Sequence, residues 1–192
     1  MTLCIGVQRK DWVDFYADSR VTSGAYPTDQ GPKVFTAHGA TWAFSGDVSI
    51  ENYLKAVAVR PYNARTREPF DRWFIRRVLP PLKEMVDRYH SDAECDLLVA
   101  VRGELWETSS GMTLTRPSRG LACVGSGSLY AYGASETFRH ARGSYEKVPF
   151  LCVCQIVGSL TETVGPPYVH YRVHRDGSTE TVETVGALAK VV

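Results

Sequence analysis

The order of strand-like and helix-like segments in this sequence predicts an α+β sandwich, with antiparallel strands packed between pairs of helices. Short apolar, β-branched segments typical of strands come first, and two segments with apolar residues at helical spacing follow. Strands and then two helices come a second time, and two strands end the pattern. The helices therefore follow runs of strands in pairs, unlike the single helices that alternate with strands in βαβ units. Because no repeat, low-complexity tract or linker interrupts the pattern, residues 1–192 are expected to form a single domain.

The strands are identified by short apolar and β-branched segments that end at turn residues. Turns are expected at Lys10-Asp11, Arg102-Gly103 and Arg175-Asp176-Gly177, and a loop rich in Gly, Pro, Asp and Gln is expected over 23–32. The predicted strands span residues 2–7, 12–18, 33–37, 40–44, 97–101, 105–108, 121–124, 168–173 and 179–185.

The helices are identified by apolar residues that recur on one face. The predicted helices span residues 48–59, 69 to about 90, 129–141 and 148–163. Pro80-Pro81 is expected to bend or divide the second of them, because proline has no N–H for the helical hydrogen bond.

The composition excludes several classes of protein. Lys and Arg number 22 and Asp and Glu 21, so a net charge of +1 gives no global attraction to nucleic acid or to anionic membranes. No apolar run approaches the roughly 18–20 residues that cross a bilayer. The first residues lack the basic region and long apolar stretch of a signal peptide. These observations predict a cytoplasmic protein with no nucleic-acid or membrane partner.

The cysteines and histidines do not form an obvious metal site. The five cysteines, an odd number in apolar surroundings, are expected to be buried thiols in a reducing compartment. Cys152-x-Cys154 has the alternative reading of a metal site, but no second Cys or His pair stands nearby at ligand spacing. His170 and His174 flank strand-like sequence and are expected at the surface. No cofactor is expected.

The second residue carries a possible catalytic chemistry. A threonine with a free α-amine can use its hydroxyl as nucleophile and its own amine as general base. Thr2 follows Met1, and a small second residue normally allows removal of the initiator methionine. Many sequences begin with Met-Thr, so Thr2 by itself is weak evidence for catalysis.

Four further motifs, in order along the chain, strengthen the case for Thr2. Taken with Thr2 they resemble the β-subunits of the proteasome and the HslV protease subunit, over roughly residues 2–140. The motif with the most specific likeness is Gly-Ser-Gly-Ser-x-Tyr-Ala-Tyr-Gly. The motifs are Ala17-Asp18-Ser19-Arg20-Val21-Thr22, Lys33-Val34-Phe35, Ala43-Phe44-Ser45-Gly46-Asp47 and Gly125-Ser126-Gly127-Ser128-Leu129-Tyr130-Ala131-Tyr132-Gly133.

The resemblance implies the four-layer αββα fold of the N-terminal nucleophile (Ntn) hydrolases, with two antiparallel sheets between helix pairs. It also implies a threonine-type endopeptidase that acts on peptides or unfolded proteins inside a self-assembled, homo-oligomeric ring. An AAA+ unfoldase partner is a further expectation from the resemblance, although no feature of this chain indicates that partner directly.

The resemblance also assigns roles to individual residues. Thr2 is expected to be the nucleophile, activated by Lys33. Asp18 is expected to pair with Lys33 and keep it charged, with Arg20 as further support. The remaining two assignments concern hydrogen bonds: Ser126 to the α-amine, and the backbone N–H of Gly46 to the oxyanion. Each residue taken singly has a simpler reading as a turn or surface residue.

The sequence departs from the family pattern after the fourth helix. Active members carry an Asp and a Ser-Gly-Gly there, whereas residues 159–168 contain no Asp; Glu162 or Thr161 could substitute only after a backbone shift. The stretch from Thr2 to Lys33 is also one residue shorter than usual. The loop over 23–32 can absorb the shorter stretch. The missing Asp, and Met1 if it is retained, favour a rival interpretation, a catalytically inactive proteasome-like structural subunit of a larger assembly such as a phage particle. An amidase of another Ntn family is a third and weaker interpretation.

Overall fold

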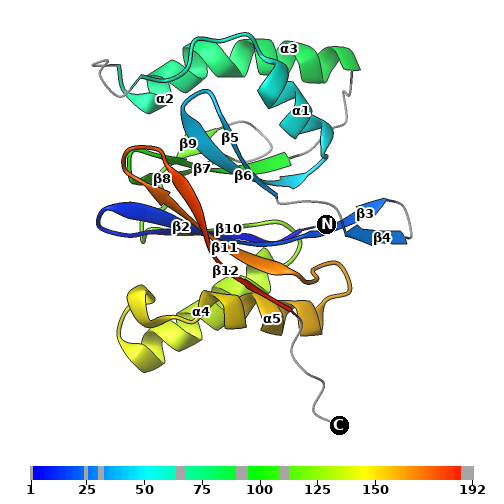
Figure 1. The fold of residues 1–192 in the computed structure, drawn as a ribbon, viewed down its shortest axis with the longest axis vertical. Coiled ribbons are helices and arrows are strands. Elements are labelled where there is room, and N and C mark those ends of the chain that lie inside the picture. The colour runs from blue at the N-terminus through cyan, green and yellow to red at the C-terminus, as the bar shows by residue number, and fades with distance from the viewer. Residues whose placement is uncertain are drawn as a thin grey trace.

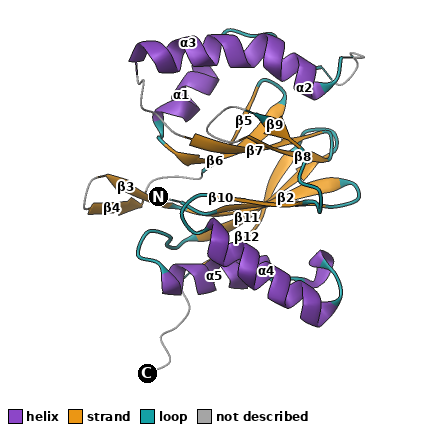
Figure 2. Ribbon diagram, turned by 180° about the vertical axis from the view of Figure 1, so that it is seen from behind, coloured by secondary structure: helices purple, strands orange, loops and turns teal. Residues whose placement is uncertain are grey.

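The protein is a four-layer sandwich, as predicted. The computed structural model describes residues 2–23, 26–29, 33–63, 68–89, 95–108 and 113–186. Figure 1 shows helices α1 to α3 above two stacked sheets and helices α4 and α5 below them, and Figure 2 shows the same layers from behind. The predicted α+β fold class, with two antiparallel sheets between helical layers, is therefore confirmed.

Each of the two main sheets contains five strands, and all their pairings are antiparallel. The first has the order β10-β1-β2-β11-β12 and the second the order β5-β6-β7-β8-β9. A separate pair, β3-β4, projects at one end of the sandwich. The strands are β1 (Cys4–Gln8), β2 (Trp12–Asp18), β3 (Arg20–Ser23), β4 (Tyr26–Asp29), β5 (Val34–Ala37), β6 (Ala40–Gly46), β7 (Cys95–Val101), β8 (Glu104–Thr108), β9 (Leu114–Thr115), β10 (Leu121–Val124), β11 (Tyr168–His174) and β12 (Thr179–Val185).

Two strand pairings were not expected from the sequence. The loop predicted over 23–32 overlaps the β3-β4 hairpin, although residues 24, 25 and 30–32 of it lie outside the described part of the chain. The β-branched Val21, Thr22 and Thr28 favour the extended backbone, despite the turn residues around them. The short strand β9, paired with β8, was also missed.

The helices follow the predicted order, with one irregular turn. They are α1 (Ser49–Ala56), α2 (Phe70–Trp73), α3 (Leu79–Tyr89), α4 (Ser128–Arg142) and α5 (Phe150–Leu160), with a short 3₁₀ turn over Tyr145–Lys147. A π-helical turn, Phe74–Val78, joins α2 to α3 directly before Pro80 and Pro81. The two prolines cannot donate to the carbonyls of Arg76 and Arg77, one helical turn earlier, and these carbonyls lie within the π-helical turn. The prolines thus accompany a local irregularity and do not end the helix.

Three apolar clusters hold the four layers together. One, which includes Trp42 and Phe74, lies between the second sheet and helices α1 to α3. Another, which includes Ile5 and Phe150, lies between the first sheet and helices α4 and α5. The third, with Phe15 and Leu98, lies between the two sheets. Side chains alternate along each strand, so every central strand contributes to two clusters.

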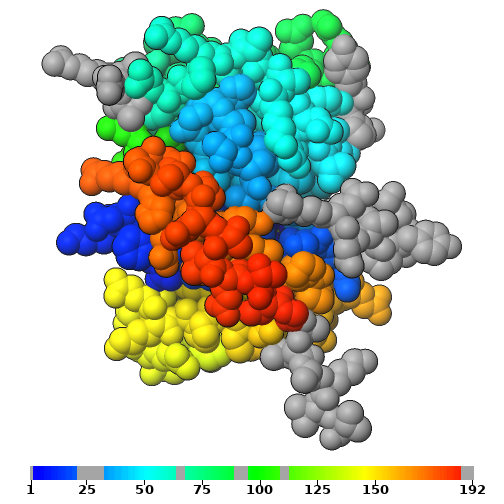
Figure 3. Space-filling view, in the orientation of Figure 1, coloured from blue at the N-terminus to red at the C-terminus, as the bar shows by residue number. Residues whose placement is uncertain are grey.

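Strand β12 forms an edge of the first sheet and is exposed along most of its length. Figure 3 shows this strand, in red, across the surface between the two helical layers. Its sequence is Thr-Glu-Thr-Val-Glu-Thr-Val, and Val182 is one of the more exposed large apolar residues of the described chain. Within the described residues, no helix combines the length and the apolar character needed to traverse a bilayer.

Candidate active site

The predicted site residues converge on one end of the sandwich. Thr2 precedes β1, and Asp18 is the last residue of the neighbouring β2. Cys4 pairs with Ala17 on one side and with Val124 on the other, which brings the start of β1 beside Asp18 and beside the loop containing Ser126. The polar members Thr2, Asp18 and Lys33 are all buried.

A buried ion pair forms the centre of this site. Lys33 Nζ lies 2.7 Å from Asp18 Oδ1, and the side chains of Lys33 and Asp18 are only 3% and 0% exposed. The same Asp18 oxygen accepts a hydrogen bond of 2.9 Å from the backbone N–H of Leu3. Asp18 therefore joins the ammonium group of Lys33 to the peptide unit directly after Thr2.

Asp18 is surrounded by donors on both of its oxygens. The backbone N–H of Gly165 donates to Asp18 Oδ2 at 3.2 Å, from a loop 147 positions away in the sequence. Burial raises the pKa of the Asp18 carboxyl, while Lys33 and the two backbone N–H groups oppose that rise. These donors favour the ionised carboxylate, and the carboxylate in turn favours a charged Lys33.

Glycine is required where the Gly-Ser-Gly-Ser motif passes Thr2. Gly125 has a φ of +97°, and a Cβ atom on it would lie 2.0 Å from the carbonyl oxygen of Thr2 and 2.8 Å from Ser45 Oγ. The backbone of the motif can approach β1 and the end of β6 only because this side chain is absent. The close approach places the loop that carries Ser126 against Thr2.

Ser126 has a partner that the sequence did not indicate. Its hydroxyl lies 3.1 Å from the hydroxyl of Thr163. Of the two residues considered as substitutes for the missing Asp, Thr161 donates its hydroxyl to the Val157 carbonyl, and Glu162 accepts from Arg20 through its backbone carbonyl. The segment after α5, which lacks the Asp expected from the resemblance, thus presents a neutral hydroxyl to Ser126.

Arg20 fixes the loop that supports Asp18. Its Nη1 donates to the Glu162 carbonyl at 2.9 Å, and a Cβ atom on Gly165 would lie 2.2 Å from the Arg20 guanidinium carbon. Buried Arg20 Nε has no hydrogen-bond partner among the described residues. The guanidinium plane lies against Gly165, whose N–H reaches Asp18, so the supporting role predicted for Arg20 has a direct structural route.

Gly46 and Phe44 lie at the end of β6. Gly46 has a φ of +114° and pairs with Cys95, and Asp47 directly after it accepts from the backbone N–H of Ser49 at the start of α1. The oxyanion role of Gly46 stays a prediction. Phe44 is buried and meets Phe35 edge-on, with ring centroids 6.0 Å apart.

Gly165, Thr163 and Gly125 are the site residues that were not singled out from the sequence. Gly125 belongs to a recognised motif, and its closeness to Thr2 follows from the β1–β10 pairing. Gly165 contacts Asp18, 147 positions away, and Thr163 contacts Ser126, 37 positions away. A single sequence does not indicate such distant contacts; it shows only that Gly165-Pro166-Pro167 is a turn.

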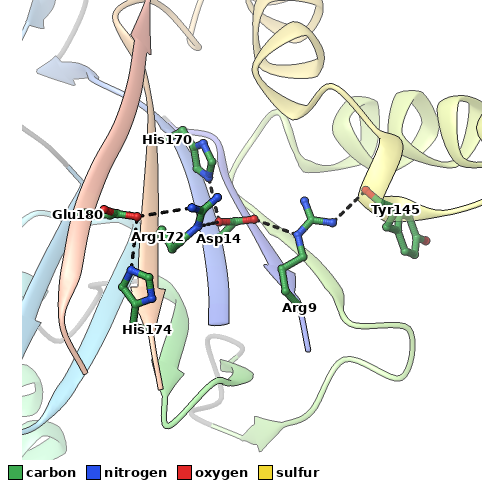
Figure 4. A network of polar contacts seen from close by, with 7 residues as sticks. All are labelled: Arg9, Asp14, Tyr145, His170, Arg172, His174 and Glu180. Atoms are coloured by element: carbon green, nitrogen blue, oxygen red, sulfur yellow. Dashed lines mark hydrogen bonds and ion pairs between the residues drawn. The ribbon is translucent and has the colours of Figure 1, made fainter. Parts of the chain in front are cut away.

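A second buried carboxylate, Asp14, lies on the same face of β2. Figure 4 shows it between Arg9 and His170, with Arg172 alongside. Asp14 accepts from Arg9 Nε at 2.9 Å and from Arg172 Nε at 3.3 Å, and His170 Nε2 lies 2.9 Å away. Burial acts to raise the pKa of Asp14, but the hydrogen bonds from His170 and Arg9 outweigh it and lower the pKa to about 2.

The expectation of a surface position was wrong for His170. This residue lies within β11, is buried, and stacks on Tyr16 with ring centroids 4.3 Å apart. The carboxylate of Asp14, which pairs with Arg172 in the β2–β11 register, lies 2.9 Å from His170 Nε2 and stabilises the imidazole inside the protein. The strand pattern of β11 alone did not reveal this contact. His174 is about two-fifths exposed and lies near Glu180.

The cysteines are free, and all but Cys152 are buried. Burial raises the pKa of Cys4 and of Cys95 to about 12, so both remain protonated thiols near neutral pH. The Cys4 thiol donates to the Phe44 carbonyl close to the site. The described residues include no cluster of three or more His, Cys, Asp or Glu side chains that could hold a metal ion.

Comparison with known proteins identifies relatives through structure and not through sequence. No model of a protein family matches the sequence, and no curated protein matches it. The solved structures that match include HslV from Trypanosoma brucei, at 16% identity and a TM-score of 0.63, covering 90% of this chain and 99% of that one. Another is BPH of Thiobacillus denitrificans in complex with epoxomicin, at 14% identity and a TM-score of 0.66, covering 90% of this chain and 98% of that one.

A third structural relative is the Anbu complex from Pseudomonas aeruginosa, solved as a helical assembly. It has 14% identity and a TM-score of 0.70, with 98% of this chain and 88% of that chain covered. Identities this low establish the fold alone. The resemblance to proteasome-like Ntn hydrolases is therefore confirmed as a shared fold, along nearly the whole chain.

Proposed function

We propose that this protein is a threonine-type endopeptidase of the proteasome and HslV type, with Thr2 as its nucleophile. The observation that carries the proposal is the buried Lys33–Asp18 ion pair, whose carboxylate also holds the peptide N–H next to Thr2. Burying two charges away from water is costly. Replacing either partner would destabilise the protein by about 3–5 kcal/mol, because the other charge would stay buried without a partner. A lysine in this position has a direct use, because it lowers the pKa of a nearby hydroxyl.

The proposed reaction begins once Met1 has been removed and Thr2 has a free amine; Met1 itself lies outside the described residues. The Thr2 hydroxyl attacks the peptide carbonyl, and its proton passes to the α-amine, assisted by the positive charge of Lys33. The Gly46 N–H stabilises the oxyanion. As the tetrahedral intermediate collapses, the α-ammonium gives its proton to the leaving nitrogen, so the amine departs and an ester is left on Thr2. Water then hydrolyses the ester and restores the hydroxyl.

We further propose that the site operates within a homo-oligomer of at least six subunits. Leu129 and Tyr130, on the first turn of α4 beside the Gly-Ser-Gly-Ser motif, are 82% and 52% exposed, and Ile75 is 53% exposed. Large apolar side chains in such positions are typical of contact surfaces. One of the structural relatives forms a helical assembly. Light scattering on a sizing column tests this part, and a monomer at micromolar concentration would contradict it.

A non-catalytic role in a larger assembly is the second candidate. The observation that favours it is the neutral Thr163 hydroxyl facing Ser126, in a segment where active relatives carry an Asp. Under this alternative the Lys33–Asp18 pair is a structural remnant of the fold, and Thr2 needs no free amine.

The deciding experiment compares wild type with Thr2→Ala and Thr2→Ser in one preparation. Intact mass spectrometry should show the loss of Met1, and a panel of fluorogenic peptides should be cleaved by wild type, weakly by Thr2→Ser and not by Thr2→Ala. Epoxomicin, which one structural relative binds, should add its mass to wild type and not to Thr2→Ala. Retention of Met1 together with absence of hydrolysis in the assembled protein would support the non-catalytic candidate.

A further inference from the structure

A cavity at the opposite end of the sandwich is lined by three arginines from three separate segments. Its volume is about 510 Å³, and Arg60, Arg102 and Arg175 contribute to its wall. Arg60 follows α1, Arg102 lies in the turn between β7 and β8, and Arg175 lies in the turn between β11 and β12. Along β2, the His174 end of β11 pairs with Trp12 and the Tyr168 end with Asp18, so this cavity and the Thr2 site are about 20 Å apart.

The arginines of this cavity have no anionic partner in the part of the chain that the structure describes. Among the described residues, no hydrogen bond or ion pair is formed by the guanidinium group of Arg60, Arg102 or Arg175. Asp176, an acidic residue on the wall, accepts from the backbone N–H and the hydroxyl of Ser178 and is held within its own turn. Arg102 and Arg175 also line an adjoining cavity whose wall includes Glu68 and Glu104, and there Glu104 is paired with Arg116.

Arg102 occupies a backbone position that disfavours it. Its φ is +57°, followed by Gly103 at +77°, and two-residue turns of this kind prefer Asn, Asp or Gly in the first position. An L-residue with a long side chain is disfavoured in the left-handed region. Arg102 is therefore held at this position of the cavity wall at some cost in stability.

We propose that this cavity binds a multiply charged phosphate anion, either a free polyphosphate or the phosphate chain of a nucleotide. Guanidinium groups bind phosphate oxygens in a bidentate manner. Three such groups that enter the cavity from different segments fit a ligand with several negative charges better than a ligand with a single carboxylate. The volume is within the range of small-ligand sites. The net charge of +1 gives no global attraction to a nucleic acid.

Calorimetric titration at low ionic strength, where such contacts are strongest, tests the proposal with sodium tripolyphosphate as probe. We expect binding by wild type, and affinities lower by about tenfold or more in Arg102→Ala and in Arg175→Ala, since each change removes a charge-assisted contact. Arg175→Ala replaces an exposed turn residue, and circular dichroism should show both variants folded. The matched control is Arg88→Ala, which removes an exposed arginine from the distant helix α3 and should leave the affinity unchanged.

Two further probes define the ligand. Titration with ATP distinguishes the sources: tighter binding than tripolyphosphate identifies a nucleotide, and equal or weaker binding identifies a free polyphosphate. Citrate should bind much more weakly than tripolyphosphate. The proposal is overturned if tripolyphosphate does not bind, if citrate binds equally well, or if Arg88→Ala weakens binding as much as Arg175→Ala does. Because no readout involves peptide hydrolysis, the result is independent of the proposed peptidase activity.

Discussion

Asp14 and Asp18 lie four residues apart on one face of β2, both nearly inaccessible to solvent, yet their surroundings differ in kind. Asp14 has hydrogen bonds to two arginines and a contact to His170, and its pKa is lowered. Asp18 has one cationic partner, Lys33, and two backbone donors, and burial raises its pKa. Several cations stabilise the carboxylate at Asp14, whereas at Asp18 the carboxylate faces a single lysine and two backbone N–H groups, one of them directly after Thr2.

The comparison predicts that the cations around Asp14 are needed for the stability of the folded protein, whereas the lysine beside Asp18 is needed for peptide hydrolysis. Lys33→Met should reduce peptide hydrolysis by about 1,000-fold or more, because the Thr2 hydroxyl loses the group that activates it. The double variant Thr2→Ala with Lys33→Met should be no worse than Thr2→Ala, since the two residues act in one step. The measurement is kcat/KM on a fluorogenic peptide.

Arg9→Met is the matched control for Lys33→Met, since it removes one cation from the other buried carboxylate. It should leave kcat/KM within about twofold, because this residue has no route to Thr2, while lowering stability. Full activity in folded Lys33→Met would show that the two carboxylate sites do not differ as proposed.

Asp14→Asn should lower the free energy of unfolding by about 2–3 kcal/mol. It leaves the mostly buried Arg9 and the partly exposed Arg172 without a carboxylate, and solvent screening at Arg172 keeps the loss below that of a fully buried pair. Urea unfolding followed by circular dichroism measures the change. A loss below about 0.5 kcal/mol would mean that the network in Figure 4 contributes little to stability.

Acid should affect the two carboxylates in opposite directions. The folded-state pKa of Asp14, about 2, lies below its ordinary value of 3.8, so its stabilising contribution is present above pH 3.8 and is lost as pH falls through 2. That contribution is at most roughly 2 kcal/mol. The pKa of Asp18 is raised, so its effect on stability is most favourable below its ordinary pKa and weakens as pH rises.

Urea midpoints at pH 5, 4, 3 and 2 for wild type and Asp14→Asn measure this pH dependence. The variant should show a flatter decline between pH 4 and pH 2, because it lacks the group whose protonation removes stability. Parallel curves would assign the acid sensitivity to other carboxylates.

Thr163→Val tests the smallest expected effect. It keeps the shape of the side chain but removes the hydroxyl that faces Ser126, and kcat/KM should fall by about two- to tenfold through loss of one hydrogen bond. Thr137→Val removes an exposed hydroxyl bonded to the Gly133 carbonyl on α4 and should have no effect. Equal losses in the two variants would indicate a general effect of hydroxyl removal, and not a role of Thr163 in the site.

Much of the fold could be predicted, because the spacing of apolar residues and the order of the strand-like and helix-like segments can be read directly from the sequence. The strands on either side of Lys10-Asp11 and of Arg175-Asp176-Gly177 were located correctly, since apolar alternation and turn residues coincide there. The π-helical turn before Pro80 and the β3-β4 hairpin were not, because each depends on a balance between backbone hydrogen bonds that composition does not reveal.

The candidate site could be predicted in part, where its members belong to recognisable motifs. Asp18 and Lys33 were named from such motifs, and the structure brings their side chains together. Gly165, which donates to Asp18, could not be predicted from the sequence. It acts through its backbone N–H, a group that every residue except proline has. His170 was misplaced for a related reason, since its buried position depends on Asp14, in a strand 156 positions away along the chain.

The exposed edge strand β12 has a consequence for how the protein avoids aggregation. An unpaired edge offers a row of N–H and C=O groups to any other extended chain, and β-branched residues such as Thr181, Val182 and Thr184 favour that pairing. Glu180, which lies beside Arg172 and His174, and Glu183 place carboxylates among these residues. Charged side chains on an edge strand disfavour pairing with a second copy, so we expect the two carboxylates to oppose fibrillar association of this strand.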